Sequence, residues 1–160
     1  MTLGRVPLKY RHVYGEPVKK EFWYENVPIS RNAHDGSFIA CNPSFIAVVM
    51  ESGGGGAFLV LNKTQTGRMS GMNLPRVCGH KGAILDLQWN PFDDHIIASC
   101  SEDCTIKLWQ IPDGGVTGDL TNHLVELQGH QRRVLYSQWH PSAAHILASA
   151  AHDHKVMIWD

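Results

Sequence analysis

The chain has 160 residues, of which 43% are hydrophobic and 18% are charged, and its formal net charge is −1 at pH 7. This balance excludes a charged disordered segment and a strongly basic nucleic-acid-binding protein. The longest uninterrupted apolar run, Phe45 to Met50, is too short to cross a bilayer, and no apolar stretch follows the basic residues at the N-terminus as a secretory signal requires.

The N-terminal segment is the basic part of the chain. Residues 1–31 contain six Lys or Arg and three Glu, a local balance of +3, so the remaining 129 residues carry −4. We expect residues 1–35 to form a basic N-terminal arm with an entry strand.

Residues 36–70 are predicted to form a divergent first blade of a β-structure. The stretch "CNPSFIAVVMESGGGGAFLVL" at 41–61 has an Asn-Pro turn followed by two β-rich runs that are joined by glycines. A phosphate-binding loop needs Gly-Lys-Ser/Thr before a helix, whereas here a strand pattern follows and no lysine is near. The glycine run at 53–56 therefore predicts a turn and not a phosphate site.

Two longer stretches, 79–109 and 129–159, repeat each other without a gap, fifty residues apart. Apolar residues alternate with polar ones in short runs, as in Leu85, Leu87 and Trp89, and turn-forming residues separate the runs. A repeat of short strands at this spacing is typical of β-propeller blades. We expect one WD-repeat blade over 71–120 and a second over 121–160, truncated at its end. Twelve residues of the first copy recur in the second: Gly79, His80, Leu85, Gln88, Trp89, Pro91, His95, Ile96, Ala98, Ser99, Asp103 and Trp109.

Each copy also holds one set of four polar or aromatic residues at identical spacing. His, Ser and Asp together could indicate a hydrolase, but a catalytic triad occurs once per domain and this set is duplicated with its strands. We expect two structural hydrogen-bond networks in which Asp accepts from His, His bonds Ser, and Ser meets the Trp indole. The sequence therefore predicts no enzyme activity. The two sets are His80, Ser99, Asp103 and Trp109, and His130, Ser149, Asp153 and Trp159.

Neither histidine-rich nor cysteine-rich segments match a zinc site. The "HDH" at 152–154 and the pair Cys100 and Cys104 lack the common ligand spacings, so no metal or other cofactor is expected. The four cysteines are dispersed through strand-like patterns, which favours free thiols and a cytoplasmic protein.

Several tracts resemble the coronins, a family of WD-repeat actin-binding proteins. The resemblance rests on "YRHVYG" at 10–15, the Asn-Pro unit with "GGGAFLV", "RRV…WHP" at 132–141 and the final Trp159-Asp160; "VPISRNAHD" and "WNPFDD" are most similar to type 2 coronins. It implies an all-β, seven-bladed WD-repeat propeller with antiparallel four-stranded blades, followed by a linker and a coiled coil. About three blades are expected here, so the chain is interpreted as a fragment or a truncated isoform.

The resemblance also implies the partner and the location. A coronin-type chain is expected to bind actin filaments, and other cytoskeletal proteins besides, in the cytoplasm and cytoskeleton, without nucleic acid or an integral membrane segment. Many coronins place a basic residue where this chain has Pro28, which weakens the expectation of filament binding. The alternative is a WD-repeat scaffold for other proteins with no filament contact. The candidate actin-binding residues are Lys9, Arg11, Lys19, Lys20, Arg31, Arg132 and Arg133.

Overall fold

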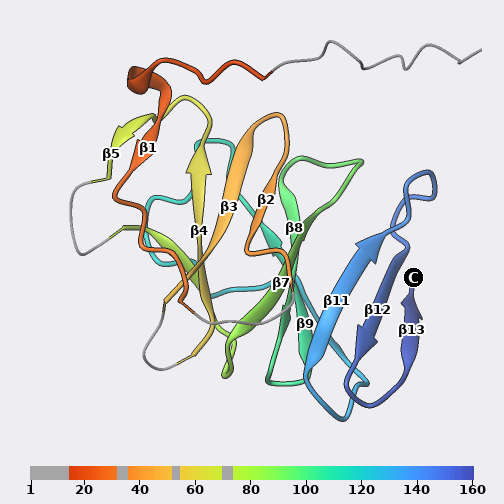
Figure 1. Cartoon of the computed structure of the whole chain (residues 1–160). Helices are drawn as coiled ribbons and strands as arrows, with labels where there is room; N and C mark the ends of the chain where they lie inside the picture. Colours follow the sequence, from red (N-terminus) through yellow and green to blue (C-terminus); the bar gives the residue numbers. More distant parts are fainter. Residues whose placement is uncertain (1–14, 32–35, 52–54, 70–73) are drawn as a thin grey trace, which may run out of the picture.

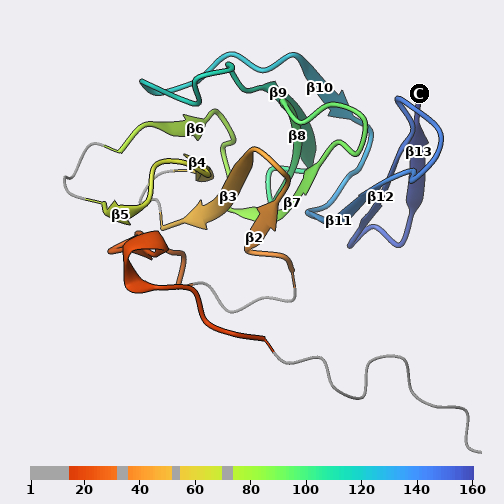
Figure 2. The same cartoon turned by 90° about the horizontal axis from the view of Figure 1, so that it is seen from above.

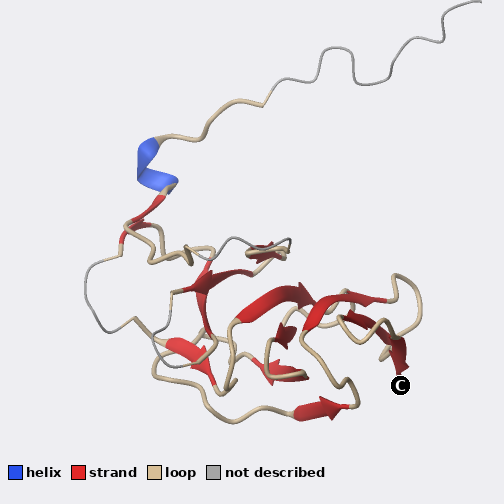
Figure 3. Ribbon diagram, turned by 60° about the horizontal axis from the view of Figure 1, so that its bottom comes forward, coloured by secondary structure: helices blue, strands red, loops and turns tan. Residues whose placement is uncertain are grey.

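The computed structural model describes residues 15–31, 36–51, 55–69 and 74–160. Over these ranges the chain is built of β-strands, apart from one turn of 3₁₀-helix, η1 (Lys20–Phe22), in the N-terminal arm (Figure 3). No helix in the described ranges is long and apolar enough to span a bilayer. The predicted all-β class is confirmed.

Three antiparallel sheets stand side by side, each built from consecutive segments of the chain (Figure 1). Sheet 1 consists of β2 (Ile39–Cys41), β3 (Phe45–Met50), β4 (Ala57–Asn62) and β6 (Arg76–Cys78). Sheet 2 consists of β7 (Ile84–Trp89), β8 (Ile96–Ser101), β9 (Thr105–Gln110) and β10 (Val125–Gln128). Sheet 3 consists of β11 (Val134–Trp139), β12 (Leu147–Ala151) and β13 (Val156–Trp159). The sheets radiate like sectors, with β2, β7 and β11 innermost (Figure 2).

The sheets do not coincide with the segments expected from the sequence. The fourth strands β6 and β10 lie beyond residues 70 and 120, where those segments were expected to end. Each outer strand leads directly into the Gly-His pair of the next repeat, so one sequence repeat contributes strands to two sheets. Sheet 3 has three strands within the described residues. This offset links each sheet covalently to its neighbour.

Side chains from adjacent sheets form the two apolar cores. The first core lies between sheets 1 and 2 and includes Phe45, Phe58 and Trp109; the second lies between sheets 2 and 3 and includes Ile106 and Leu147. Burial on both faces explains why the strand pattern of sheets 1 and 2 is more apolar than a simple alternation.

One tryptophan of each repeat ties its innermost strand to the preceding sheet. The Trp89 indole donates to the Ala40 carbonyl at 3.1 Å, and the Trp139 indole donates to the Gln88 carbonyl at the same distance. Trp89 also stacks on Phe45, with ring centroids 5.8 Å apart. The repeated Trp-x-Pro of the sequence is therefore an inter-sheet contact.

The N-terminal arm runs along the outside of sheet 1. Its strand β1 (Tyr24–Glu25) pairs in parallel with β5 (Gly67–Arg68), and the Tyr24 hydroxyl donates to the Asn62 carbonyl at 3.1 Å. Further along the arm, the Ser30 amide donates to the Val49 carbonyl. These contacts hold the arm from one end of sheet 1 to the other (Figure 1).

Candidate functional site

The four repeated residues of sheet 2 form one continuous line of hydrogen bonds. His80 Nδ1 lies 2.9 Å from Asp103 Oδ2, His80 Nε2 lies 2.7 Å from Ser99 Oγ, and the Trp109 indole donates to the same Oγ at 2.8 Å. Because the indole occupies an acceptor site of Ser99, we assign the hydroxyl proton to His80 Nε2 and the imidazole proton to Nδ1, facing Asp103. The network joins the Gly-His loop, the β8–β9 turn and two strands.

Sheet 3 repeats this geometry. His130 Nδ1 lies 3.1 Å from Asp153 Oδ2, His130 Nε2 lies 2.8 Å from Ser149 Oγ, and the Trp159 indole donates to Ser149 at 2.8 Å. The residue after each Asp, Cys104 and His154, adopts a left-handed conformation in both turns. Both the side-chain line and the backbone turn are thus properties of the repeat.

The order Asp–His–Ser matches a hydrolase triad, but these atoms cannot reach a substrate. Ser99 has 0% of its surface exposed, and its oxygen already accepts from Trp109. A nucleophile needs an open face toward the scissile bond and a nearby oxyanion site. The arrangement therefore supports a structural role.

Hydrogen bonding determines the charge of the two aspartates. Burial alone would raise the pKa of Asp103, but hydrogen bonds from His80, Thr105 and the Lys81 amide hold the pKa below its usual range. Burial also opposes ionisation of Asp153, yet the amides of Gln131 and Lys155 and the His130 ring lower its pKa to about 2. Both carboxylates are ionised at neutral pH.

The glycine before each histidine leaves room for the tryptophan of the network. A Cβ on Gly79 would lie 3.0 Å from the Trp109 ring, and a Cβ on Gly129 would lie 3.0 Å from the Trp159 ring. The close approach of the backbone to the indole ring therefore explains why glycine precedes each histidine.

Gly79→Ala is expected to destabilise the fold by about 1–3 kcal/mol, because the added methyl group forces the buried indole out of its packed position. Gly114→Ala is the matched control, since nothing lies within 4 Å of its would-be Cβ. Urea titration of the two variants in a complete propeller measures the difference. Equal stability of both variants would show that Trp109 can move freely.

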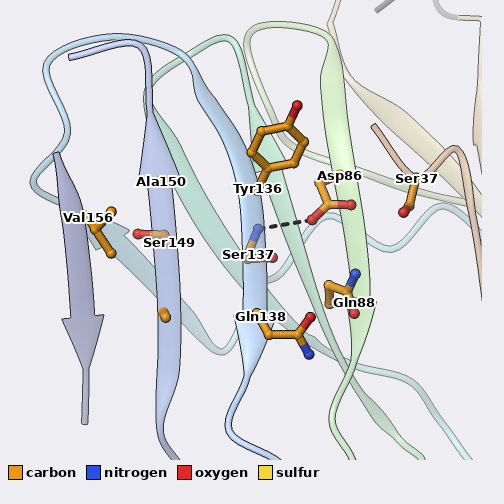
Figure 4. A pocket seen from close by; sticks show the side chains of 10 residues that line it. Ser37, Asp86, Gln88, Tyr136, Ser137, Gln138, Ser149, Ala150 and Val156 are labelled. Atoms are coloured by element: carbon orange, nitrogen blue, oxygen red, sulfur yellow. Dashed lines mark hydrogen bonds between the residues drawn. The ribbon is translucent and has the colours of Figure 1, made fainter. Parts of the chain in front are cut away.

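A pocket of about 270 Å³ opens beside β7, β11 and β12 (Figure 4). Its polar lining includes Ser37, Asp86, Gln88 and Gln138. The buried Asp86 carboxylate accepts the Ser137 amide at 2.9 Å, which links sheets 2 and 3, and burial raises its pKa despite this bond. The described lining holds one carboxylate and one tyrosine, Tyr136, and no histidine, lysine or cysteine.

The described cysteines differ in exposure, from Cys41 at the surface to the buried Cys100. All four cysteines are free, and burial raises the pKa of the Cys100 thiol far above its usual range. Such a thiol is inert. The described residues contain no cluster of three or more His, Cys, Asp or Glu that could hold a metal ion.

The candidate cations that the structure describes lie at two opposite ends of the sheets. We call the end with residues 42–44, 62–64 and 90–95 the Asn-Pro end, and the end with residues 79–83, 102–105, 129–133 and 152–155 the Gly-His end. Asn42 and Ser44 bond Asp94 at the first, and Gln131 bonds Asp153 at the second. Six-residue strands separate the ends by about 20 Å.

Lys19 and Lys20 lie at the Asn-Pro end, where Thr66 donates to the Glu21 carbonyl beside them. Lys20 forms an exposed ion pair with Glu25 at 3.3 Å. Arg31 pairs with Glu51 at 3.5 Å, just after β3 ends and therefore at the other end of sheet 1. Lys9 and Arg11 lie outside the described residues.

Arg132 and Arg133 lie at the Gly-His end of sheet 3. Both side chains are exposed. Arg133 reaches across to Glu102 of sheet 2 at 3.8 Å and donates to His152 at 3.1 Å. The structure does not bring these arginines together with Lys19 and Lys20.

Apolar residues of the arm were missed by the analysis of charge. Val18, Phe22 and Trp23 are 61%, 56% and 46% exposed, next to Lys19 and Lys20. We call these five residues the arm patch. Its signal in the sequence is "VKKEFW", in which apolar residues flank two lysines without a strand or helix period. Exposed aromatic groups beside cations are frequent at protein interfaces.

Two family models match the chain. The model described as "Domain of unknown function (DUF1899)" covers residues 8–68, and the WD domain, G-beta repeat, covers residues 72–110 and 121–160. The WD-repeat matches begin before the Gly-His pairs and so include the outer strand of the preceding sheet.

Curated relatives and a solved structure are coronins. Over 119 residues, 74% of this chain, it is 57% identical to Coronin-2A of Homo sapiens and 51% identical to Coronin-2B of Mus musculus. The chain spans 22% and 25% of the length of these relatives. The WD40 domain of Toxoplasma gondii coronin superposes with a TM-score of 0.81 at 28% identity, covering 89% of this chain and 38% of that one. The chain belongs to the coronin family, in its type 2 branch.

Proposed function

We propose that this chain is part of a non-enzymatic coronin that binds actin filaments through the arm patch and takes part in organising the actin cytoskeleton and in cell motility. The observation that carries the proposal is the exposure of Phe22 and Trp23 beside Lys19 and Lys20. An actin filament has an acidic surface, so lysines at the rim would orient the encounter while the aromatic rings supply contact area. A cytoplasmic, cytoskeletal location follows from this partner.

The candidate residues lie at two ends of the sheets, and we prefer the end that combines cations with exposed apolar area. At the Asn-Pro end, Lys19 forms no ion pair with the residues that the structure describes, and exposed apolar side chains lie beside it. Each end also holds cations that pair within the chain: Lys20 pairs with Glu25 at the Asn-Pro end, and Arg31 and Arg133 face carboxylates at the Gly-His end. The exposed Phe22 and Trp23 distinguish the Asn-Pro end. The arm patch is therefore our preferred filament contact.

Lys19→Glu with Lys20→Glu, in a complete coronin propeller that carries this sequence, is expected to weaken filament co-sedimentation about tenfold at low salt. The loss should shrink as salt rises, because exposed charges are screened over about 8 Å at physiological ionic strength. Phe22→Ser should weaken binding at all salt concentrations, since it removes apolar contact area.

Two controls separate the surfaces. Phe92→Ser alters another exposed phenylalanine of the Asn-Pro end, outside the arm, and should leave binding unchanged. Arg132→Glu with Arg133→Glu tests the opposite end. If only the arginine pair reduces co-sedimentation, the filament contact lies at the Gly-His end.

The second candidate function is a WD-repeat scaffold that does not touch filaments. It is favoured by the ion pairs of Lys20 and Arg31, which occupy two arm cations, and by Pro28 at a position that is basic in many coronins. Unchanged co-sedimentation for both charge-reversed pairs would favour this function.

A further inference from the structure

The Gly-His ends of sheets 2 and 3 share a scaffold but differ in charge. In sheet 2, residues 79–83 and 102–105 carry one cation, Lys81, and two carboxylates. In sheet 3, the equivalent residues 129–133 and 152–155 carry three cations and one carboxylate. The three cations are Arg132, Arg133 and Lys155, which stand where sheet 2 has Gly82, Ala83 and Thr105.

The single carboxylate of this end holds the loops together and does not neutralise their outer surface. Asp153 accepts the amides of Gln131 and Lys155, each at 3.1 Å, as well as the His130 ring. The His152 amide donates to the Arg133 carbonyl. The backbones of both loops are thereby joined, and the three cationic side chains are exposed on the outside of them.

The scaffold does not require these cations. Sheet 2 forms the same Asp–His–Ser–Trp line with uncharged residues at all three positions. Three cations on adjacent loops repel one another, which disfavours the folded chain slightly unless an anion offsets the repulsion. The shared scaffold therefore does not account for the charge of this surface.

We propose that the Gly-His end of sheet 3 binds an acidic segment of a partner protein, through Arg132, Arg133 and Lys155. Guanidinium groups pair with carboxylates in a two-pronged geometry, and a lysine adds a compact charge beside them. The cations occupy only two short loops, which suits a short run of Asp or Glu and not the longer phosphate track of a nucleic-acid duplex.

Glu102 of sheet 2 acts as an internal competitor at this site. Its carboxylate lies 3.8 Å from the Arg133 guanidinium, and both side chains are about half exposed. A carboxylate of the partner displaces Glu102 from this guanidinium, and His152 keeps the other side of Arg133 in place at 3.1 Å. The site lies at the opposite end from the arm patch, so it does not depend on the proposed filament contact.

The test uses a complete propeller carrying this sequence and a fluorescein-labelled hexaglutamate peptide, with binding measured by fluorescence anisotropy. Arg132→Glu with Lys155→Glu is expected to weaken binding at least about tenfold. Glu102→Gln should tighten binding about two- to fivefold, because it removes the competing carboxylate. A gain of affinity on removing a surface charge is not expected from a merely structural role.

Lys19→Glu with Lys20→Glu is the matched control, since it reverses two exposed lysines at the other end and should leave peptide affinity unchanged. Equal weakening by this pair would show binding through overall charge and overturn the proposal. Failure of the unmodified propeller to bind the peptide, or binding of phosphatidylserine vesicles in its place, would also overturn it. Filament co-sedimentation of the same variants reports on the proposed function separately.

Discussion

The 160-residue chain studied alone is expected to self-associate through the open face of sheet 3. Val156 and Ile158 of β13 are each 73% exposed, and Tyr136 of β11 is 45% exposed. In sheet 2 the equivalent face is covered by sheet 3. Ile106, which corresponds to Val156, packs in that core and is 0% exposed.

The driving force is large for so small a surface. Covering a Val or Ile side chain completely contributes about 1.5–3 kcal/mol. β13 is the outer strand of sheet 3 and pairs with a strand on one side only. Other copies of the chain can cover this open face. Association is therefore expected to increase with protein concentration.

Analytical ultracentrifugation over a concentration series tests this expectation. Val156→Lys with Ile158→Lys should restore a monomer, while Lys63→Glu, at the Asn-Pro end, should not. A monodisperse wild-type monomer with a sharp cooperative melt would contradict the expectation and would mean that three sheets suffice for a stable fold.

Asp103→Ala is expected to destabilise a complete propeller by about 1–3 kcal/mol, because the buried His80 and the Lys81 amide lose their acceptor. Asp103→Asn should cost less, since an amide oxygen still accepts a hydrogen bond. Asp153→Ala should destabilise in the same direction through His130. Urea titrations measure all three. An Asp103→Ala variant as stable as the wild type would show that the network is dispensable.

Asp103 and Asp153 are also expected to make the free energy of unfolding depend on pH in the acid range. A carboxylate whose pKa is lowered on folding adds stability above its unfolded pKa of about 3.9, and this stability is lost as the pH falls through the folded value. For Asp153 the loss is expected between about pH 4 and its folded pKa of about 2. The pKa of Asp103 is also lowered, so Asp103→Ala should flatten the acid limb of the stability curve. An unchanged acid limb would contradict this assignment.

Asp86 is expected to have the opposite effect on the pH dependence of stability. Burial raises its pKa in the folded chain, so the ionised form is disfavoured by folding and this cost sets in as the pH rises above its unfolded value. Asp86→Asn should therefore reduce that cost at neutral pH while keeping an acceptor for the Ser137 amide. Its effect on the acid limb has the opposite sign to that of Asp103→Ala, which distinguishes the two.

Local pattern was sufficient for the strands and their turns. The alternation in 84–89, the Asn-Pro turns and the exact fifty-residue spacing predicted the all-β class and the position of each repeat in the chain. These are local properties, because side-chain direction in a strand alternates with a period of two and turn conformations are decided by a few adjacent residues. The partners within the hydrogen-bond line also followed from the sequence, since a duplicated polar set inside apolar strands needs mutual satisfaction.

Contacts between strands and between sheets determined which charged residues are buried and where the exposed cations lie. Lys107 alternates with apolar neighbours in the sequence as a solvent-facing residue would, yet it is buried, because β10 places Glu126 opposite it. Asp86 is buried for a similar reason, since the Ser137 amide of the next sheet meets it. The separation of Lys19 and Lys20 from Arg132 and Arg133 is likewise set by strand direction across sheets.

What the sequence determined by itself was therefore the kind of strand, the turn between strands and the unit that repeats. What only the tertiary structure decided was which outer strand joins which sheet, which charges are buried and at which end the exposed cations lie. The physical reason is that a strand pattern depends on neighbours along the chain, whereas burial and electrostatic partners depend on groups brought close by packing, about fifty residues away in this repeat.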